Sequence, residues 1–569
     1  MNSKKIGDFF NGRRFFEIPK YQRGFAWEKR NIRELFDDIK EAIDTTSNHY
    51  IGTLVLSKKQ NKDEHFYIVD GQQRIITITL IINALLEYLS ESDVSFYRRL
   101  YIKEDKTFRL KMLGKDDNYF INLLNEIINE PENKSQRLLK EAYEEIQLII
   151  KDVGDKKGFL DSVGNLEMME FIEESEGDAI RIFQTVNDRG KLLSNMEKAK
   201  SLLIYFSNKY LEKRLDDKVN EIFGEIFEIY DDIKHIGETV GITLIKNMDF
   251  NEDDIMRYHF ISFSDENYDP AASYVLNYLK SKLAEYRRDD KVNEYRNMET
   301  FINDYVKSLY TFFKSLKDLL ERTKNIEKYY KILSILGISA TLYPLIVKLE
   351  TLGILEKNLS GKEYSQYTFL DLLEIIDVRV YKIPKSDPRA DISRFAYMIN
   401  DELKEDKIQD WLLSYNKQWT SKERFLTYLN EDIYRNSALP HIFIEYCEEI
   451  NGRKYSIDEL INFVNKIPTI EHILSKTPKF TYKSVGFKNS EHFLEYENTL
   501  GNLTILEKSI NSTIQNKLPF DKIPFYDKSL FKMTRELSSL IHRNKKFVMK
   551  NIEERTKYLV DKISARWWC

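Results

Sequence analysis

The stretch HFYIVDGQQRIITITLIINALLEYL, residues 65–89, places a short strand pattern directly before a long apolar run. HFYIVD is rich in the aromatic and β-branched residues of strands, and Gly71 ends it. The apolar run after Gly71 is too long for a strand, so its length predicts a buried helix despite its β-branched residues. A strand-to-helix turn is therefore predicted at Asp70-Gly71-Gln72-Gln73-Arg74.

Flanking patterns extend this turn into a mixed N-terminal segment at residues 1–110. YIGTLVLS, from Tyr50, predicts a second strand, and apolar residues between Ile32 and Ile43 recur at helical spacing. The pattern is helical over residues 111–240 and 241–465. Residues 466–569 combine a short mixed segment with a basic helical tail. We expect a mainly α-helical, multidomain α+β protein with these four parts.

Length and composition exclude several classes of protein. At about 150 residues per domain, 569 residues predict roughly three to four domains. A hydrophobic content of 42% excludes wholesale disorder, and only 20 Gly and 11 Pro favour long helices over many short strands. The two cysteines, Cys447 and Cys569, exclude a disulfide framework. With no apolar run of membrane-spanning length, we expect a cytoplasmic protein without a membrane partner.

Charge is distributed unevenly along the chain. The formal net charge is −5, yet residues 470–569 hold 18 Lys and Arg against 11 Asp and Glu. The remainder holds 69 basic against 81 acidic residues. A basic module on an acidic body suits binding of a polyanion, with Arg543, Lys545, Lys546 and Lys550 as candidate phosphate contacts. The alternative is an ordinary solvated helix face.

The predicted turn has the residue types of an anion-binding site. A helix start offers free backbone N–H groups and the positive end of the helix dipole. Gly71 lets a ligand approach the backbone, and Arg74 can clamp a phosphate. Gln72 and Gln73 suit amide recognition or the positioning of water, while Asp70 suits a hydroxyl or a metal. The alternative is a capped turn with surface arginines.

Two further motifs offer partners for this turn. IPKYQRGFAW, residues 18–27, supplies a second Gln-Arg pair through Tyr21, Gln22 and Arg23. The tetrapeptide NDRG, with Asn187 and Arg189, is a good turn sequence with glycine where positive φ is tolerated. A structural turn is the simpler interpretation of NDRG, although its arginine could complete an anion pocket.

The third constellation is the most specific. Glu471-His472 on a short strand can present a metal ligand and a general base to one small site. About thirty residues later, Asn502 can fix the loop that aims the histidine, and Asn511 on a following helix would be a second oxygen ligand. One divalent cation, Mg²⁺ or Mn²⁺, and one neutral imidazole suffice for phosphodiester hydrolysis. A lone Glu-His pair would more often be surface decoration.

Taken together, these motifs resemble a known family. IPKYQRGFAW, YIVDGQQR and FQTVNDRGKLLS look like the N-terminal ParB-like (sulfiredoxin-fold) domain of GmrSD-type restriction proteins. EHIL followed by GNLTILEKSINSTIQNKLPFDK looks like their C-terminal HNH-type (ββα-metal) nuclease domain. The resemblance implies a type IV restriction system that cuts modified DNA in anti-phage defence. It further implies regulation by a nucleoside triphosphate, whether GTP, ATP, CTP or UTP, that the N-terminal domain binds and hydrolyses.

The resemblance also assigns residue roles. Asp70, Gly71, Gln72, Gln73 and Arg74 match the nucleotide motif, with Tyr21, Gln22 and Arg23 alongside. His472 matches the general base, Glu471 the metal-site carboxylate, Asn502 the loop asparagine and Asn511 the third HNH position. This chain departs from the family at Ser475-Lys476, where a proline usually follows, and it has no zinc-binding cysteines to brace the nuclease fold.

The expected partner is double-stranded DNA, with modified phage DNA foremost, and a homodimer stays open. Which DNA modification is sensed also stays open. Two alternatives remain. The chain could be a nucleotide-gated DNA-binding defence protein with a degenerate nuclease domain, or an RNA-targeting toxin nuclease. Metal-dependent cleavage that His472→Ala abolishes separates the enzyme from the first, and choice of substrate separates it from the second.

Overall fold

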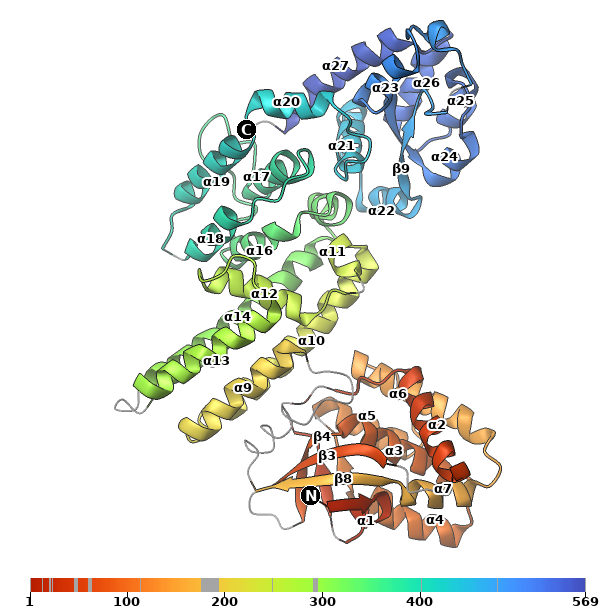
Figure 1. Cartoon of the computed structure of the whole chain (residues 1–569), viewed down its shortest axis with the longest axis vertical. Coiled ribbons are helices and arrows are strands. Elements are labelled where there is room, and N and C mark those ends of the chain that lie inside the picture. Colours follow the sequence, from red (N-terminus) through yellow and green to blue (C-terminus); the bar gives the residue numbers. More distant parts are fainter. Residues whose placement is uncertain are drawn as a thin grey trace. The chain divides into compact units, whose positions relative to one another are not determined.

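A computed structural model describes most of the chain, in the ranges 2–12, 14–19, 22, 24–45, 50–59, 64–112, 114–174, 194–247, 249–289, 295–400, 402–477 and 479–567. The chain divides into two compact units. One combines Met1–Asp231 with Leu276–Tyr310, and the other combines Asp232–Val275 with Thr311–Cys569. The described residues are mainly helical with one large sheet, which confirms the predicted mainly helical α+β class (Figure 1).

The first unit is built on a six-stranded sheet of order β1-β8-β3-β4-β2-β7. β3 runs parallel to β8 and antiparallel to β4, and β2 runs parallel to both β4 and β7. Figure 1 shows β3, β4 and β8 together in this sheet. Its strands are β1 (Asn2–Lys5), β2 (Phe15–Glu17), β3 (Tyr50–Lys58), β4 (His65–Asp70), β7 (Leu110–Lys111) and β8 (Glu167–Glu173). A separate small hairpin pairs β5 (Lys103–Glu104) with β6 (Thr107–Phe108).

Helices bury the apolar residues of this sheet. α3 (Gln72–Leu86) confirms the helix predicted after Gly71, and nearly all of its side chains are buried, which explains its apolar character on every side. The core around it draws on residues from Ile6 to Met168. The surrounding helices are α1 (Ile6–Phe10), α2 (Lys29–Thr45), α4 (Glu91–Tyr97), η1 (Arg98–Ile102), α5 (Gly114–Leu124), α6 (Lys134–Lys151) and α7 (Lys156–Asn165).

β8 corrects the prediction that residues 111–240 are helical except at FQTVNDRGKLLS. EMMEFIE pairs antiparallel with β1 and parallel with β3, so a strand from the predicted helical region lies inside the N-terminal sheet. The core of this unit contains residues on both sides of position 110. The chain then enters α9 (Asn195–Tyr210) and α10 (Asp216–Val240). The predicted NDRG turn lies outside the described residues.

The second unit is helical over most of its length. Its C-terminal part contains a two-stranded antiparallel hairpin of β9 (Pro468–His472) and β10 (Leu503–Glu507). Helices α23 (Ser490–Glu497) and η7 (Leu500–Asn502) precede β10, and α24 (Lys508–Ile514) follows it directly. α25 (Pro519–Tyr526), α26 (Lys532–Asn544) and α27 (Met549–Arg566) complete a local core that contains Ile473, Leu474, Leu506 and Ile552.

The remaining helices lie between α10 and the hairpin, or within the hairpin loop. They are α11 (Thr243–Lys246), α12 (Glu252–Phe263), α13 (Ala272–Asp289), α14 (Arg296–Arg322), α15 (Glu327–Tyr330), η3 (Lys331–Leu336), η4 (Ala340–Leu342), α16 (Tyr343–Thr351), α17 (Phe369–Ile376), η5 (Asp377–Lys382), α18 (Ala390–Met398), α19 (Glu405–Trp419), α20 (Lys422–Asn430), α21 (Leu439–Asn451), α22 (Ile457–Asn465) and η6 (Tyr482–Val485). No helix among the described residues is long and apolar enough to cross a membrane.

Candidate active site

The β9–β10 hairpin carries the Glu-His pair at its loop end, where the chain leaves β9. His472 is paired with Leu503 and Glu471 with Thr504. Successive side chains of a strand point to opposite faces, so the two side chains point away from each other. Both are buried, and within the described part of the chain no residue hydrogen-bonds to both of these side chains. The sequence predicted that both side chains face one small site. The structure instead places them on opposite faces of β9.

His472 is oriented by a chain of two side chains. Its Nε2 lies 3.0 Å from Asn498 Oδ1, and Asn498 Nδ2 donates to Asp432 Oδ2 at 2.7 Å. Because a carboxylate only accepts, Asp432 fixes which end of the Asn498 amide faces the histidine. The amide oxygen then accepts a hydrogen bond from Nε2–H of His472. The lone pair of the neutral ring is therefore on Nδ1.

Burial makes this ring a neutral group at physiological pH. It lowers the pKa of His472 to about 4, against the opposing effect of the Asn498 hydrogen bond. The Tyr434 ring packs against the imidazole with 4.2 Å between the ring centroids. Lys476 Nζ lies 4.5 Å from the Tyr434 ring centroid, and its side chain is 41% exposed. Lys476 Nζ also pairs with Glu497 Oε1 at 3.3 Å, so the site combines an unprotonated imidazole with a part-exposed cation that already has a carboxylate partner.

Asn502 holds the segment that follows His472. Its Oδ1 accepts from Leu474 N at 2.8 Å, and its Nδ2 donates to Leu474 O at 3.0 Å and to Glu497 O at 2.8 Å. The side chain is completely buried. These contacts fix the backbone on both sides of Leu474, and the role of Asn502 in a nuclease site stays a prediction.

Glu471 is engaged by a buried lysine that sequence reasoning missed. Lys522 Nζ lies 2.6 Å from Glu471 Oε1, and Tyr526 Oη donates to the same oxygen at 3.3 Å. Lys522 is fully buried. Burial raises the pKa of Glu471 and lowers that of Lys522, and each partner opposes the shift of the other. The one available signal was the spacing of Lys522 and Tyr526, four residues apart on one helix face.

Asn511 lies near Glu471 but does not complete a metal site with it. Asn511 Nδ2 donates to Thr469 Oγ1 at 2.9 Å, and Thr469 shares a strand face with Glu471. Carboxylate and amide oxygens are ligands that Mg²⁺ accepts, but Lys522 already balances the charge of Glu471. No group of three or more His, Cys, Asp or Glu side chains in the described part of the chain could hold a metal. The side chains therefore do not fit a divalent ion on Glu471 while Lys522 stays in place.

The DGQQR turn forms a second candidate site in the first unit. Gly71 has a φ of 90° and precedes α3, and no side chain caps the start of this helix. A Cβ at Gly71 would lie 2.4 Å from Leu54 Cδ1, so both the conformation and the space require glycine. Asp70 Oδ1 accepts from Gly71 N, and burial raises the pKa of Asp70 to about 6.

The glutamines connect this turn to the IPKYQRGFAW segment. Gln22 Nε2 donates to Val69 O at 2.6 Å, and Gln72 Nε2 donates to Gln22 Oε1 at 3.0 Å. Gln73 accepts from Ala26 N and donates to Gly24 O. The two motifs therefore meet, and these contacts engage the glutamine amides except Gln72 Oε1, which is buried without a hydrogen-bond partner in the described part of the chain. Arg74 donates to Thr53 O at 3.3 Å. The predicted Tyr21, Arg23, Asn187 and Arg189 lie outside the described residues.

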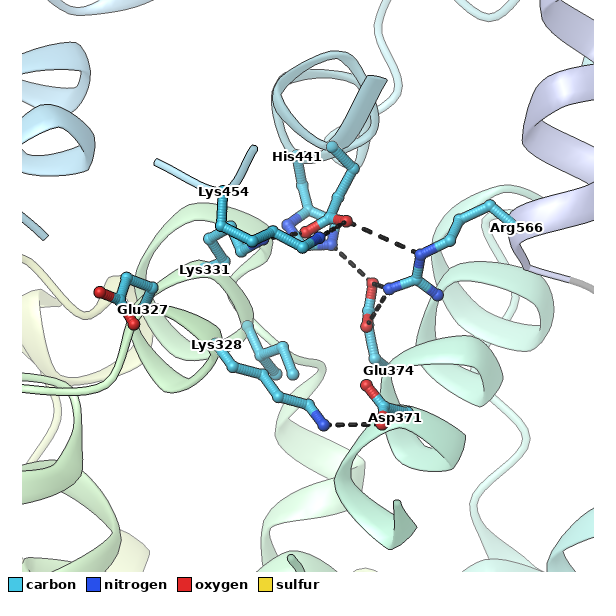
Figure 2. Close-up of a pocket in the computed structure, with 10 residues that line it drawn as sticks. Glu327, Lys328, Lys331, Asp371, Glu374, His441, Lys454 and Arg566 are labelled. Atoms are coloured by element: carbon cyan, nitrogen blue, oxygen red, sulfur yellow. Dashed lines mark hydrogen bonds and ion pairs between the residues drawn. The ribbon is translucent and has the colours of Figure 1, made fainter. Parts of the chain in front are cut away.

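A cavity of about 210 Å³ in the second unit is lined by charged side chains (Figure 2). Glu374 lies at its centre, with contacts to His441 Nε2 at 2.8 Å, Arg566 Nη2 at 3.0 Å and Trp567 Nε1 at 3.1 Å. Lys331 pairs with Glu445 and Glu448, and Lys328 pairs with Asp371. Because each of these cations already has a carboxylate partner, the cluster is a structural joint that connects the end of α27 to α17 and α21.

A histidine held neutral beside an exposed cation, on a hairpin followed by a helix, defines a candidate hydrolase site. Comparisons with known families agree with this class. The model of the GmrSD restriction endonuclease N-terminal domain matches residues 6–204, and that of the GmrSD restriction endonuclease C-terminal domain matches residues 415–562. The chain belongs to the GmrSD restriction endonuclease family, which confirms the resemblance seen in its motifs. No curated protein matches the chain.

Proposed function

We propose that this chain is a type IV, modification-dependent DNA endonuclease that acts in the cytoplasm against phage DNA. The observation that carries the nuclease mechanism is the Asp432–Asn498–His472 chain of hydrogen bonds. It supports a base whose Nδ1 is free of a proton at neutral pH. Lys476 pairs with Glu497 but is 41% exposed, and it supports binding of a phosphodiester beside that base, since an ammonium attracts the phosphate charge.

In the proposed reaction, His472 Nδ1 takes a proton from a water molecule. The water oxygen forms a bond to phosphorus, the phosphorus bond to the leaving ester oxygen breaks, and that oxygen takes a proton from solvent. A requirement for Mg²⁺ or Mn²⁺ remains a prediction. The proposed reaction contains no metal-bound step, because Lys522 already balances the negative charge of the predicted ligand Glu471.

We further propose that the first unit binds and hydrolyses a nucleoside triphosphate at Asp70–Arg74, and that the nucleotide regulates cleavage. The uncapped start of α3 and the left-handed Gly71 support an anion site there. A bound nucleotide can shift the state of the protein only if it binds one state better than another.

The test is cleavage of matched unmodified and phage-modified DNA, with Mg²⁺ or Mn²⁺, with and without nucleotide. We expect His472→Ala to lower the cleavage rate by roughly 10²–10⁴-fold while DNA binding is retained. His542→Ala, which removes an exposed histidine, is the matched control and should cut normally. Wild-type cleavage by His472→Ala would remove His472 from the mechanism. In the same assay Arg74→Ala should lose nucleotide hydrolysis, and unchanged hydrolysis would place the nucleotide site elsewhere.

A further inference from the structure

Lys522 contacts a cluster of oxygen atoms at the end of β9. Its side chain reaches from α25 to the end of β9 and is completely removed from solvent. Nζ lies 2.6 Å from Glu471 Oε1, 2.7 Å from the carbonyl oxygen of His472 and 3.1 Å from that of Ile473. The Ser475 hydroxyl is farther, at 3.4 Å. An ammonium has three N–H donors, so the three nearest oxygens satisfy it.

This set of oxygens resembles the ligand shell of a small cation. One carboxylate and two backbone carbonyls converge on one positive charge, as they do around a bound metal ion. Tyr526, one helical turn after Lys522, donates to the same carboxylate oxygen. Because His472 and Ile473 contribute their carbonyls, the ammonium fixes the backbone that carries the proposed base.

We propose that Lys522 is a positioning residue that takes the place of a metal cation at Glu471 and thereby presents His472 for catalysis. Glu471 is then the counter-ion of Lys522 and not a ligand of a divalent ion. This inference rests on the proposed role of His472 as the base. It assigns the pair a structural task, because a fully buried ammonium cannot touch DNA phosphate.

Removal of one or both charges tests the proposal in the full-length protein. Glu471→Gln or Lys522→Met alone leaves a buried charge without its partner, whereas the double variant Glu471→Gln/Lys522→Met leaves none. We expect each single variant to lower the melting temperature and the cleavage rate at saturating DNA. The double variant should regain most of the melting temperature and part of the rate. DNA affinity should stay within about twofold throughout. The matched control is Lys528→Met, an exposed lysine two residues after α25.

Binding of Mn²⁺ to the protein without DNA gives a readout that does not depend on activity. We expect Glu471→Gln and the wild type to have the same affinity for Mn²⁺. This expectation also holds if neither protein binds the ion. A folded Glu471→Gln protein with Mn²⁺ affinity at least tenfold below wild type would make Glu471 a metal ligand and overturn the proposal. A double variant whose melting temperature falls by as much as the losses of the two single variants added together would also overturn the proposal. If a single variant fails to fold, a folded double variant still supports the pair, and an unfolded one contradicts it.

Failure of the proposed function has a different signature. A wild-type protein that cuts no DNA, or a His472→Ala variant that cuts normally, rejects the nuclease mechanism. Melting temperatures and Mn²⁺ binding still report on the charge pair in that case. The two ideas can therefore fail separately.

Discussion

His472 acquires its proposed chemical character from residues outside its own motif. Asn498 lies 26 residues after it and Asp432 lies 40 residues before it, yet the two side chains decide which ring nitrogen keeps its proton. A histidine that only had to be buried would not need the Asp432 carboxylate to orient its partner. The pair Asp432 and Asn498 therefore belongs to the proposed site.

Asn498→Ala should slow cleavage without weakening DNA binding. The ring would lose the acceptor that holds Nε2–H, so a larger share of molecules would present the wrong nitrogen. We expect a loss of roughly 10–100-fold in kcat, smaller than that of His472→Ala because the base itself remains. Single-turnover cleavage at saturating DNA measures it. Asn544→Ala, which removes an exposed asparagine at the end of α26, is the control. A wild-type cleavage rate for Asn498→Ala would show that catalysis does not need this chain of hydrogen bonds.

At the other candidate site, the raised pKa of Asp70 makes the stability of the protein depend on pH. Burial raises its folded-state pKa from 3.8 to about 6, so the native carboxylate is ionised at pH 7.5 at a cost of about 3 kcal/mol. A raised acid pKa means that folding takes up a proton between about pH 6 and 4. This group therefore adds stability as the pH falls through that window and costs stability above it.

Asp70→Asn should remove this pH dependence and stabilise the protein at pH 7.5 by up to about 3 kcal/mol. Its amide oxygen can still accept from Gly71 N, so the turn keeps its hydrogen bond. Denaturant unfolding of wild type and variant at pH 4.5 and 7.5 gives the difference. The prediction is wrong if wild type and variant differ in free energy of unfolding by the same amount at both pH values. Loss of nucleotide binding in the stabilised variant would mark Asp70 as a functional residue retained at a cost in stability.

Glycine at position 501 lets α27 pack directly on the loop that contains Asn502. A Cβ there would lie 2.0 Å from the carbonyl oxygen of Ile552, a backbone atom that cannot turn aside. Thr556 Oγ1 accepts from Gly501 N at 2.9 Å, and Arg555 donates to the carbonyls of Leu500, Gly501 and Leu503. One helix thus braces the short segment between α23 and β10.

Gly501→Ala should destabilise the second unit by about 3 kcal/mol and abolish cleavage. The added methyl group forces α27 and the Asn502 loop apart, and overpacked sites lose stability on this scale. Calorimetry should show one transition lowered by several degrees. Gly224→Ala, in the middle of α10 with open space at its Cβ position, is the matched control and should be neutral or slightly stabilising. An unchanged melting profile for Gly501→Ala would mean that α27 does not pack there.

Elements with a local signal were predictable, and those defined by distant pairing were not. The strand and helix on either side of Gly71 followed from periodicity and length. β8 did not, because EMMEFIE becomes a strand only through its pairing with β1 and β3, which lie more than 100 residues away in sequence. The contacts of Lys522 and Asp432 could not be predicted for the same reason. Spacing along the chain cannot show which buried side chains meet across helices.

At the scale of the whole chain, the uneven distribution of charge stays the main argument for a polyanionic substrate. Arg543, Lys545 and Lys546 lie at the end of α26 and just after it, all exposed, and no ion pair holds them within the described ranges. Lys550, by contrast, is near Glu554 at 3.8 Å. We therefore predict that these three cations, close together in sequence, contact DNA phosphates.

Replacing these three residues by alanine should weaken DNA binding and flatten its salt dependence. Each lost phosphate contact reduces the slope of log K against log salt by about 0.9, so the triple variant should lose about 2.7. Fluorescence anisotropy with duplex DNA from about 50 to 200 mM salt measures the slope. The control replaces Lys280, Arg287 and Arg288, three exposed cations on α13 of the acidic body, and should keep the wild-type slope. If the control flattens the slope as much as the tail variant does, DNA contacts are not confined to the basic tail. An unchanged slope for the tail variant would make its charge a solvated surface.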